Sequence, residues 1–330
     1  MIPVSVVTGF LGSGKTTLIS RVLRDPAFGR TAVIVNEFGE IGLDHELIAS
    51  SDDSVLSLNT GCLCCAIQTD LARTLIDLLE RRAAGSVDYE RVLIETSGLS
   101  DPAPVLQSMM TDGRVSATHR LPYVVTLVDT IHGEANLMDH TEAQNQVALA
   151  DSILISKTDI KPASDRLVAE LYRLNPGTRR MTTMEATLSD LFGTPSMDVL
   201  TERLGRNPRR AFHDGIDTFT VVRDQPMPAV ALTMLLQAVA EHCGARLLRL
   251  KGLVAIEEMP GRPAVIHGVR HVVSPPDFLD GWPSGDERTR IVFITKGVPR
   301  HFVSRLLDAI EEEVRDANLG PLSTSSRSDA

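Results

Sequence analysis

The chain has 330 residues, a formal net charge of -10 and an apolar content of 43%. This length accommodates two domains with separate cores, and the composition is that of an ordinary globular protein. The negative charge argues against a general nucleic-acid-binding protein, which needs a basic surface. No apolar run reaches the roughly 18 residues of a membrane-spanning helix. We therefore expect neither a nucleic acid nor a membrane as a partner.

Short runs rich in valine and isoleucine alternate with helix-length segments over the first two-thirds of the chain. The first run, Ile2–Val7, lacks the features of a signal peptide, so a cytoplasmic protein is expected. The predicted strands are Val4–Thr8, Thr31–Asn36, Arg91–Glu95, Tyr123–Asp129 and Ser152–Ser156. The predicted helices are Lys15–Arg24, Thr69–Arg82, Pro102–Met110, Thr141–Ala150 and Ala163–Leu174. This alternation predicts an α/β fold with a mostly parallel sheet flanked by helices, whose ligands bind at the carboxyl ends of the strands.

Beyond about His213 the predicted strands outnumber the helices. The predicted strands there are Thr218–Val222, Arg246–Glu257, Ala264–Val273 and Arg290–Thr295, and the predicted helices are Ala229–His242 and Arg300–Val314. This pattern indicates a small α+β domain, for which a ferredoxin-like sandwich is one candidate. We expect a first domain of residues 1–207, a linker around Leu204–Pro208, a second domain of residues 213–318, and a disordered tail of residues 319–330.

The segment Gly9–Thr17 matches the phosphate-binding loop pattern between the first predicted strand and the first predicted helix. In such a loop, backbone N–H groups close around phosphate oxygens at a helix N-terminus. Lys15 is expected to reach the β- and γ-phosphates, the Thr16 hydroxyl to ligate Mg²⁺, and Thr17 to lie on the α-phosphate side. The expected nucleotide-binding residues of the loop are Gly12, Ser13, Gly14, Lys15, Thr16 and Thr17. The first domain is therefore predicted to be a P-loop NTPase.

The segment Val92–Gly98 has the form of a Walker-B strand that ends in a carboxylate. Glu95 is expected to act through a metal-bound water or to orient the attacking water. Gly98 would let the chain approach the γ-phosphate and sense its loss. The alternative is a strand that merely ends in a surface glutamate. The expected catalytic residues are Lys15, Glu37 and Glu95.

The segment Ile155–Asp159 is similar to the guanine-reading sequence Asn-Lys-x-Asp, with Ser156 in the place of Asn. Asp159 would accept two hydrogen bonds from the guanine base, and Lys157 would lie along that base. A site built for these bonds rejects a base that lacks the donors. The segment therefore favours GTP over ATP, the alternative being an ordinary polar loop.

Three of the four cysteines, Cys62, Cys64 and Cys65, lie within four positions. The spacing of Cys62 and Cys64 allows both thiolates to reach one ion, whereas Cys65 joins them only if the backbone bends. Such thiolates suit zinc, cobalt(II) or iron(II). Buried cysteines without a metal and a redox switch are the alternatives. The fourth cysteine, Cys243, is expected to be a core residue.

The segment Val35–His45 follows the second predicted strand, where switch segments of nucleotide hydrolases commonly lie. Glu37 is the best candidate there to contact the metal or the catalytic water. Glu40, Asp44 and His45 are weaker candidates, and an ordinary surface role is favoured for His45.

In their order along the chain, these motifs resemble the CobW-like P-loop GTPases. The resemblance rests on Gly-Phe-Leu-Gly-Ser-Gly-Lys-Thr-Thr, Asn-Glu-Phe-Gly-Glu, Cys-Leu-Cys-Cys, Glu-Thr-Ser-Gly-Leu-Ser-Asp-Pro and Ser-Lys-Thr-Asp. Later, Leu250-Lys251-Gly252 and Trp282-Pro283 resemble that family's C-terminal domain, so the similarity covers nearly the whole chain. It implies a SIMIBI-class GTPase that acts as a metallochaperone for zinc, cobalt or iron. It also implies that Cys62, Cys64 and Cys65 bind the metal, with Lys15, Thr16, Glu95 and Asp159 at the nucleotide.

The resulting hypothesis is a slow, Mg²⁺-dependent GTPase that delivers a metal to a client metalloprotein. GTP would order the segments around Glu37 and Glu95 and bring the cysteines together, and hydrolysis would release the ion. One alternative is a metal-binding regulatory or scaffold protein that uses the nucleotide only structurally. Another is an ATP-using kinase or synthetase. The sequence leaves the metal, the client and a homodimer open.

Overall fold

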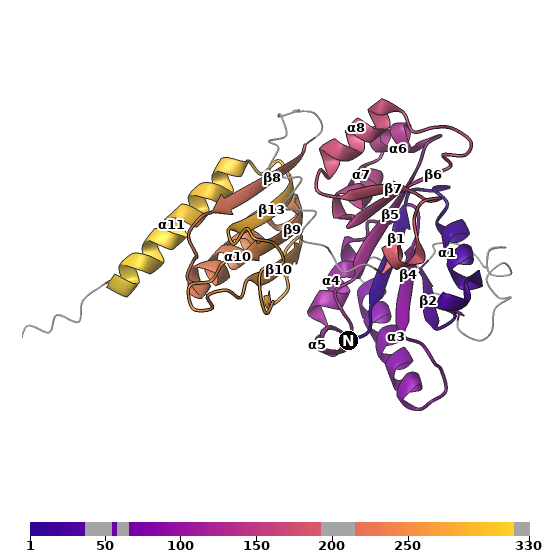
Figure 1. Cartoon of the computed structure of the whole chain (residues 1–330), viewed down its shortest axis with the longest axis horizontal. Coiled ribbons are helices and arrows are strands. Elements are labelled where there is room, and N and C mark those ends of the chain that lie inside the picture. Colours follow the sequence, from indigo (N-terminus) through magenta and orange to yellow (C-terminus); the bar gives the residue numbers. More distant parts are fainter. Residues whose placement is uncertain (37–54, 58–65, 193–214, 320–330) are drawn as a thin grey trace, which may run out of the picture.

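The computed structural model describes residues 1–36, 55–57, 66–192 and 215–319, and these residues form two sheets with their helices (Figure 1). The predicted linker around Leu204–Pro208 lies outside the described residues, as do positions 320–330 of the predicted tail. Within the described ranges, no helix combines the length and the apolar character needed to cross a membrane.

The first sheet has seven strands in the order β3-β2-β4-β1-β5-β6-β7, and every neighbouring pair is parallel. The strands are β1 (Val4–Gly9), β2 (Thr31–Asn36), β3 (Val55–Ser57), β4 (Arg91–Thr96), β5 (Tyr123–Asp129), β6 (Ser152–Ser156) and β7 (Arg179–Thr182). The helices are α1 (Lys15–Arg24), α3 (Ala66–Ala83), α4 (Ala103–Thr111), α5 (Gly113–Thr118), α6 (Gly133–Asp139), α7 (Thr141–Leu149) and α8 (Asp165–Leu174). The predicted α/β sheet is confirmed.

Helices cover both faces of this sheet because its central strands are apolar on both sides. Val6 and Ile94 pack with residues of α3 and α4, whereas their neighbours Val7 and Leu93 pack with residues of α1. This two-residue alternation is that of a strand buried between two layers. All carboxyl ends of the parallel strands therefore meet at one edge, where the connecting loops can form a site.

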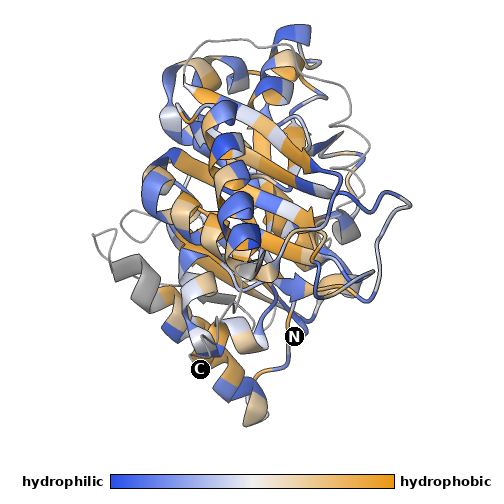
Figure 2. Cartoon of the chain, turned by 90° about the vertical axis from the view of Figure 1, so that its left-hand side faces the viewer, coloured by the Kyte–Doolittle hydropathy of each residue, from blue (hydrophilic) through white to orange (hydrophobic). Residues whose placement is uncertain are grey.

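The second sheet is antiparallel, in the order β11-β10-β9-β13-β8, with β12 paired to β10. Its elements are β8 (Ile216–Arg223), α10 (Ala229–Cys243), β9 (Leu247–Val254), β10 (Ala264–Val269), β11 (Val272–Val273), β12 (Asp277–Phe278), β13 (Thr289–Lys296) and α11 (Arg300–Leu319). Figure 2 shows mostly apolar strands behind helical ribbons that carry many hydrophilic residues. Cys243 is buried in this core, as predicted.

The ferredoxin-like candidate for this second region is wrong. A ferredoxin-like sandwich has the element order β-α-β-β-α-β, in which a helix precedes the last strand. Here α11 follows β13, and β13 lies antiparallel between β8 and β9. The predicted strand 264–273 is also divided, because the chain turns at Arg270 to form the β10–β11 hairpin.

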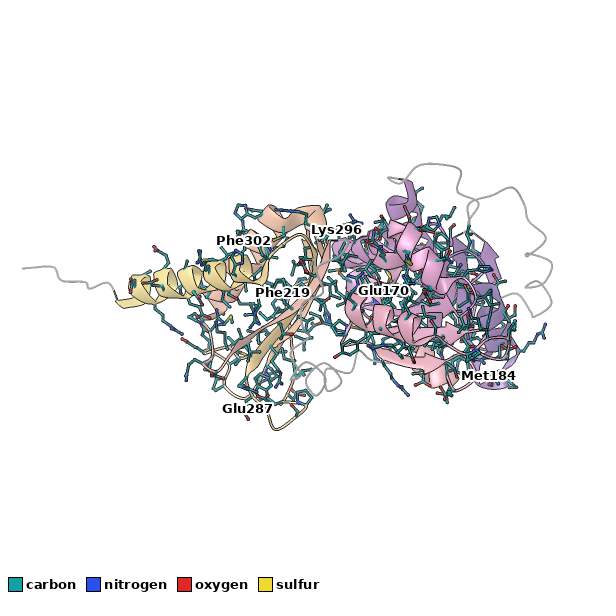
Figure 3. All side chains as sticks on the ribbon, turned by 90° about the horizontal axis from the view of Figure 1, so that it is seen from above. Glu170, Met184, Phe219, Glu287, Lys296 and Phe302 are labelled. Carbon is teal, nitrogen blue, oxygen red and sulfur yellow. The ribbon has the colours of Figure 1, made fainter. Side chains whose placement is uncertain are left out.

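The two sheets are joined by apolar packing and by a buried charge cluster. Leu248 and Ile294 of the second sheet belong to the same core as Leu171 and Leu174 of α8. Seen from above, the C-terminal sheet with Phe219 stands beside the first domain, and Met184 lies at that domain's far end (Figure 3). The second sheet is thus packed on one side by α10 and α11 and on the other by α8.

Asp151, just before β6, is the centre of the charge cluster. Arg249 and Lys251 of β9 donate to its Oδ1 at 2.5 and 2.7 Å, and the backbone N–H of Val124 donates to its Oδ2 at 3.0 Å. Burial alone would raise the pKa of Asp151, but the two cations outweigh burial and hold that pKa below its usual range. Burial lowers the pKa of Lys251 to about 8, although the charge of Asp151 opposes this.

We predict that Asp151→Asn lowers the free energy of unfolding by about 3–5 kcal/mol, because it leaves two buried cations without their counter-charge. Urea denaturation at pH 7 measures this loss. The pKa of Asp151 is lowered on folding, so its stabilisation is complete above the unfolded-state pKa of about 3.9 and is lost as the pH falls through the folded-state pKa. The difference between the variant and the wild type should therefore shrink in acid.

Asp308→Asn is the matched control. It breaks the ion pair with Arg223, in which the Asp308 side chain is 65% exposed. Exposed pairs contribute about 1 kcal/mol or less. Equal losses of unfolding free energy in Asp151→Asn and Asp308→Asn would show that the Asp151 cluster does not hold the domains together.

Candidate functional site

The loop between β1 and α1 has the backbone of a phosphate cradle. Gly14 stands immediately before α1 with φ 98°, a left-handed conformation that residues with a side chain rarely adopt. Lys15 Nζ donates to the carbonyls of Gly9 at 2.9 Å and Phe10 at 3.3 Å, so its ammonium lies across the loop. Ser13 Oγ is buried and has no hydrogen-bond partner among the described atoms. A phosphate oxygen would satisfy that hydroxyl, so the loop fits the ligand that its sequence predicts.

Thr16 and Glu95 meet beside this loop. Because β1 pairs in parallel with β4, Val7 lies opposite Glu95, and the loop that follows β1 is brought to the end of β4. Thr16 Oγ1 donates to Glu95 Oε1 at 3.2 Å, and Glu95 is only 6% exposed. A hydroxyl and a carboxylate in contact are the hard oxygen donors that Mg²⁺ prefers. The two residues therefore fit a magnesium ion, as the sequence predicts.

The loop after β4 touches the phosphate loop through its backbone. A Cβ placed on Gly98 would lie 2.7 Å from the backbone nitrogen of Leu11 and 2.8 Å from its Cα, too close for any real side chain. From the other side, Gln146 of α7 donates to the carbonyls of Gly98 at 3.1 Å and Ser100 at 3.0 Å. Gly98 is thus held between α7 and the phosphate loop.

The loop after β6 is braced against the phosphate loop. Ser156 Oγ, on a residue that is 5% exposed, donates to the carbonyl of Ser13 at 2.6 Å. Lys157 follows with φ 59°, and its Nζ lies 3.5 Å from Asp129 Oδ1 at the end of β5. Asp159 is exposed, so its carboxylate is accessible to a base. Serine in place of the usual asparagine therefore supplies a direct link between the phosphate and base segments.

The structure brings together the predicted residues of the phosphate, magnesium and base segments at one edge of the parallel sheet. Thr17 is exposed at the start of α1, as a residue facing the ligand would be. The predicted residues Glu37, Cys62, Cys64 and Cys65, and the weaker candidates Glu40, Asp44 and His45, lie outside the described residues. In the part of the chain that is described, no group of three or more His, Cys, Asp or Glu side chains is placed to hold a metal ion.

Several residues of this edge were missed by sequence reasoning. Asp129 orients Lys157 and accepts from the backbone N–H groups of Ile131 and His132. A polar residue at the end of an apolar strand was the available signal. Arg21 of α1 donates to the carbonyl of Thr183 at 2.7 Å and ties down the loop after β7. No local sequence pattern indicates this contact, because β7 itself was not predicted.

Two family models match the chain. The one described as CobW/HypB/UreG, nucleotide-binding domain, matches residues 3–182, and the one described as Cobalamin synthesis protein cobW C-terminal domain matches residues 216–311. The chain belongs to the CobW/HypB/UreG family. Strands β1–β7 fall within the first match and β8–β13 within the second. The resemblance inferred from the motifs is confirmed.

The relatives include one that matches this chain over nearly its whole length and one that matches about half of it. The zinc chaperone YjiA of Escherichia coli strain K12 is 31% identical, over 97% of this chain and 98% of the relative. The zinc-regulated GTPase metalloprotein activator 1 of Saccharomyces cerevisiae is 32% identical, over 52% of this chain and 44% of the relative. A crystal structure of Zn(II)-bound YjiA GTPase from E. coli superposes with a TM-score of 0.71 at 26% sequence identity, covering 94% of this chain and 98% of that chain.

We predict that Ser156→Ala weakens nucleotide binding about five- to tenfold, because a buried hydrogen bond to the phosphate loop is lost and the Ser13 carbonyl is left unpaired. Titration with a fluorescent guanine nucleotide measures the effect. Ser164→Ala is the matched control, since Ser164 caps α8 through the N–H of Leu167 and donates to Glu134 Oε2 at 3.0 Å, and neither contact involves the phosphate loop. An unchanged Kd in Ser156→Ala would contradict the bracing role.

We predict that Gly98→Ala displaces the loop after β4 and lowers nucleotide affinity at least several-fold, because the new Cβ meets the Leu11 backbone. Gly113→Ala is the control, since a Cβ at Gly113 meets nothing within 4 Å. Both Kd and Tm should be near wild type in the control. Equal behaviour of the two alanine variants would mean that the Gly98 contact is not a constraint on the site.

Proposed function

We propose that this chain is a GTP-hydrolysing metallochaperone. It would bind GTP with Mg²⁺ at the carboxyl edge of the parallel sheet and hold a transition metal, zinc first, through Cys62, Cys64 and Cys65. Hydrolysis would then pass the ion to a client protein. The observation that carries the proposal is the 3.2 Å contact between Thr16 and Glu95, which joins the phosphate loop to the Walker-B carboxylate. A relative matched over nearly its whole length is named a zinc chaperone.

The observed contacts of Lys15, Thr16 and Glu95 support the proposed binding of the phosphates. Lys15 now donates to two carbonyls of its own loop, and phosphate oxygens would be stronger acceptors for its charge. Thr16 and Glu95 would hold Mg²⁺, which when bound neutralises charge on the β- and γ-phosphates. Water attacks the γ-phosphorus, the bond to the bridging oxygen breaks, and GDP and phosphate leave. Glu95 or Glu37 would orient that water, and turnover without a partner is expected to be slow.

The residues proposed to contact the nucleotide base, Lys157 and Asp159, favour guanine over adenine. Asp159 is exposed beyond β6, with its carboxylate accessible to the N1 and N2 donors of a guanine base. Lys157 Nζ lies 3.5 Å from Asp129 Oδ1, and the Lys157 stem would lie along the base. The left-handed backbone at Lys157 turns the chain sharply after the strand. Adenine offers no matching pair of donors to Asp159.

The position of the cysteines in the chain supports coupling between metal and nucleotide. They lie between the carboxyl end of β3, at Ser57, and the first residue of α3, Ala66. Glu37 follows directly on the carboxyl end of β2, which pairs with β3 on one side and with β4 on the other. Both segments therefore leave the sheet from the edge that carries the phosphate loop. We assign residues 1–207 to the GTPase domain, and residues 213–318 to a C-terminal domain that helps to recognise the client.

We predict that Zn²⁺ binds at least about tenfold more tightly with a non-hydrolysable GTP analogue than with GDP, a coupling free energy of about 1.4 kcal/mol. Competition against a chromophoric chelator measures both affinities, and a parallel Co²⁺ titration reports thiolate coordination. Cys62→Ser should lose the tight site and keep GTP turnover. Lys15→Ala should keep the cysteines and lose hydrolysis.

Equal zinc affinities in the two nucleotide states would contradict the coupling. A protein that binds zinc tightly but shows no GTP turnover would instead be a metal-binding scaffold. Cys65→Ser separates a transfer site from a holding site. If Cys65 takes part only in transfer, the variant keeps its zinc affinity and loses delivery to an apo-metalloprotein.

A further inference from the structure

The β10–β11 hairpin of the C-terminal domain is docked on α4 of the nucleotide-binding domain. Val269, at the end of β10, is 7% exposed and belongs to the same core as Leu106 and Met109 of α4. Gln107 of α4 donates to the carbonyl of Val269 at 3.2 Å. Apolar packing and a buried hydrogen bond thus fix the hairpin on the helix that begins directly after the Gly98 loop.

Arg270 stands at the turn of this hairpin in a left-handed conformation, with φ 54°. Such a backbone is strained for a residue with a side chain and unstrained for glycine. The Arg270 guanidinium donates to Asp101 Oδ2 across the domain boundary. Both side chains are largely buried, 26% and 22% exposed respectively. A position that would suit glycine therefore carries an arginine that makes an ion pair between the domains.

Asp101 is the end of the loop after β4. Its Oδ1 accepts from the backbone N–H of Ala103 at 2.8 Å, at the start of α4, and its Oδ2 also accepts from Asn145 of α7 at 3.0 Å. At the other end of the loop, Gln146 holds the carbonyl of Gly98. The four-residue loop Gly98–Asp101 is therefore fixed by α7 from one domain and by Arg270 from the other.

We propose that Arg270 is a positioning residue for GTP hydrolysis, acting through Asp101 on the loop that presses Gly98 against the phosphate loop. The proposal rests on the GTPase activity proposed above. A loop this short cannot absorb a displacement of Asp101 without moving Gly98, whose backbone already touches Leu11. The C-terminal domain, through one side chain, thus sets the geometry in which the γ-phosphate is cleaved.

The test compares steady-state GTP hydrolysis by the wild type, Arg270→Gly, Arg270→Lys and His271→Ala. Arg270→Gly should lower kcat about three- to tenfold and leave KM for GTP within about twofold, because a charged hydrogen bond on the loop is lost while the phosphate loop is intact. Arg270→Lys keeps the charge and should recover most of kcat. His271→Ala, an exposed neighbour in the same turn, should match the wild type.

Thermal unfolding separates positioning from stability. Glycine relieves the left-handed backbone as it removes the ion pair, so the Tm of Arg270→Gly should stay close to wild type. If Arg270→Gly fails to fold, Asp101→Asn and Arg270→Gln, each of which removes the charge pair, take its place, and their double variant completes the cycle. The double variant should lose no more activity than Asp101→Asn alone.

The outcomes distinguish this inference from the proposed function. A wild-type kcat in Arg270→Gly, or a fully additive loss in the double variant, overturns the role of Arg270 and leaves the GTPase assignment standing. Absence of GTP turnover in the wild type overturns both. A fall in kcat that follows the fall in Tm across the variants also overturns the positioning role, because it reduces Arg270 to a structural contact.

Discussion

The backbone contact between Gly98 and Leu11 is the constraint on which the site depends. It is possible only because β1 and β4 are parallel neighbours, which brings the phosphate loop and the loop after β4 to the same edge of the sheet. It also requires a glycine, since a Cβ would overlap the backbone of Leu11. With the Thr16–Glu95 hydrogen bond beside it, this contact makes the phosphate loop sensitive to the position of the whole β4–α4 connection. In the proposed mechanism, a change at the γ-phosphate would be transmitted through this contact to the β4–α4 connection.

The β4–α4 connection would pass this change on in two directions. On one side, β2 pairs with β4, and β3 pairs with β2. The carboxyl ends of β2 and β3 lead into the segments that carry Glu37 and the three cysteines. On the other, Asp101 binds Arg270, and the hairpin of the C-terminal domain is packed on α4. The buried Asp151 cluster and the core shared with α8 keep the two domains in a fixed relation. In the proposed role of Arg270, this rigid interface would let its side chain position the loop after β4 through Asp101.

The strands and the phosphate site could be predicted from the sequence because their signals are local. Runs such as Thr31–Asn36 and Tyr123–Asp129 agree with the observed strands residue for residue, since strands buried on both faces are continuously apolar. The three-residue β3 is too short to show a period, and the edge strand β7 contains Arg179 and Arg180, so both were missed. The Asp101–Arg270 pair joins residues 169 positions apart and leaves no trace in any local pattern. Contacts of this kind exist only once the chain has folded.

In the proposed function, cleavage of the γ-phosphate lowers the protein's affinity for its metal. A single-turnover experiment on the zinc-loaded full-length protein tests it most directly, with phosphate release and zinc release followed together by two reporter dyes in one stopped-flow trace. If hydrolysis drives metal release, both signals rise with the same rate constant, and a non-hydrolysable GTP analogue abolishes both. Release of phosphate while zinc stays bound, or release of zinc at the same rate with the analogue, would contradict it.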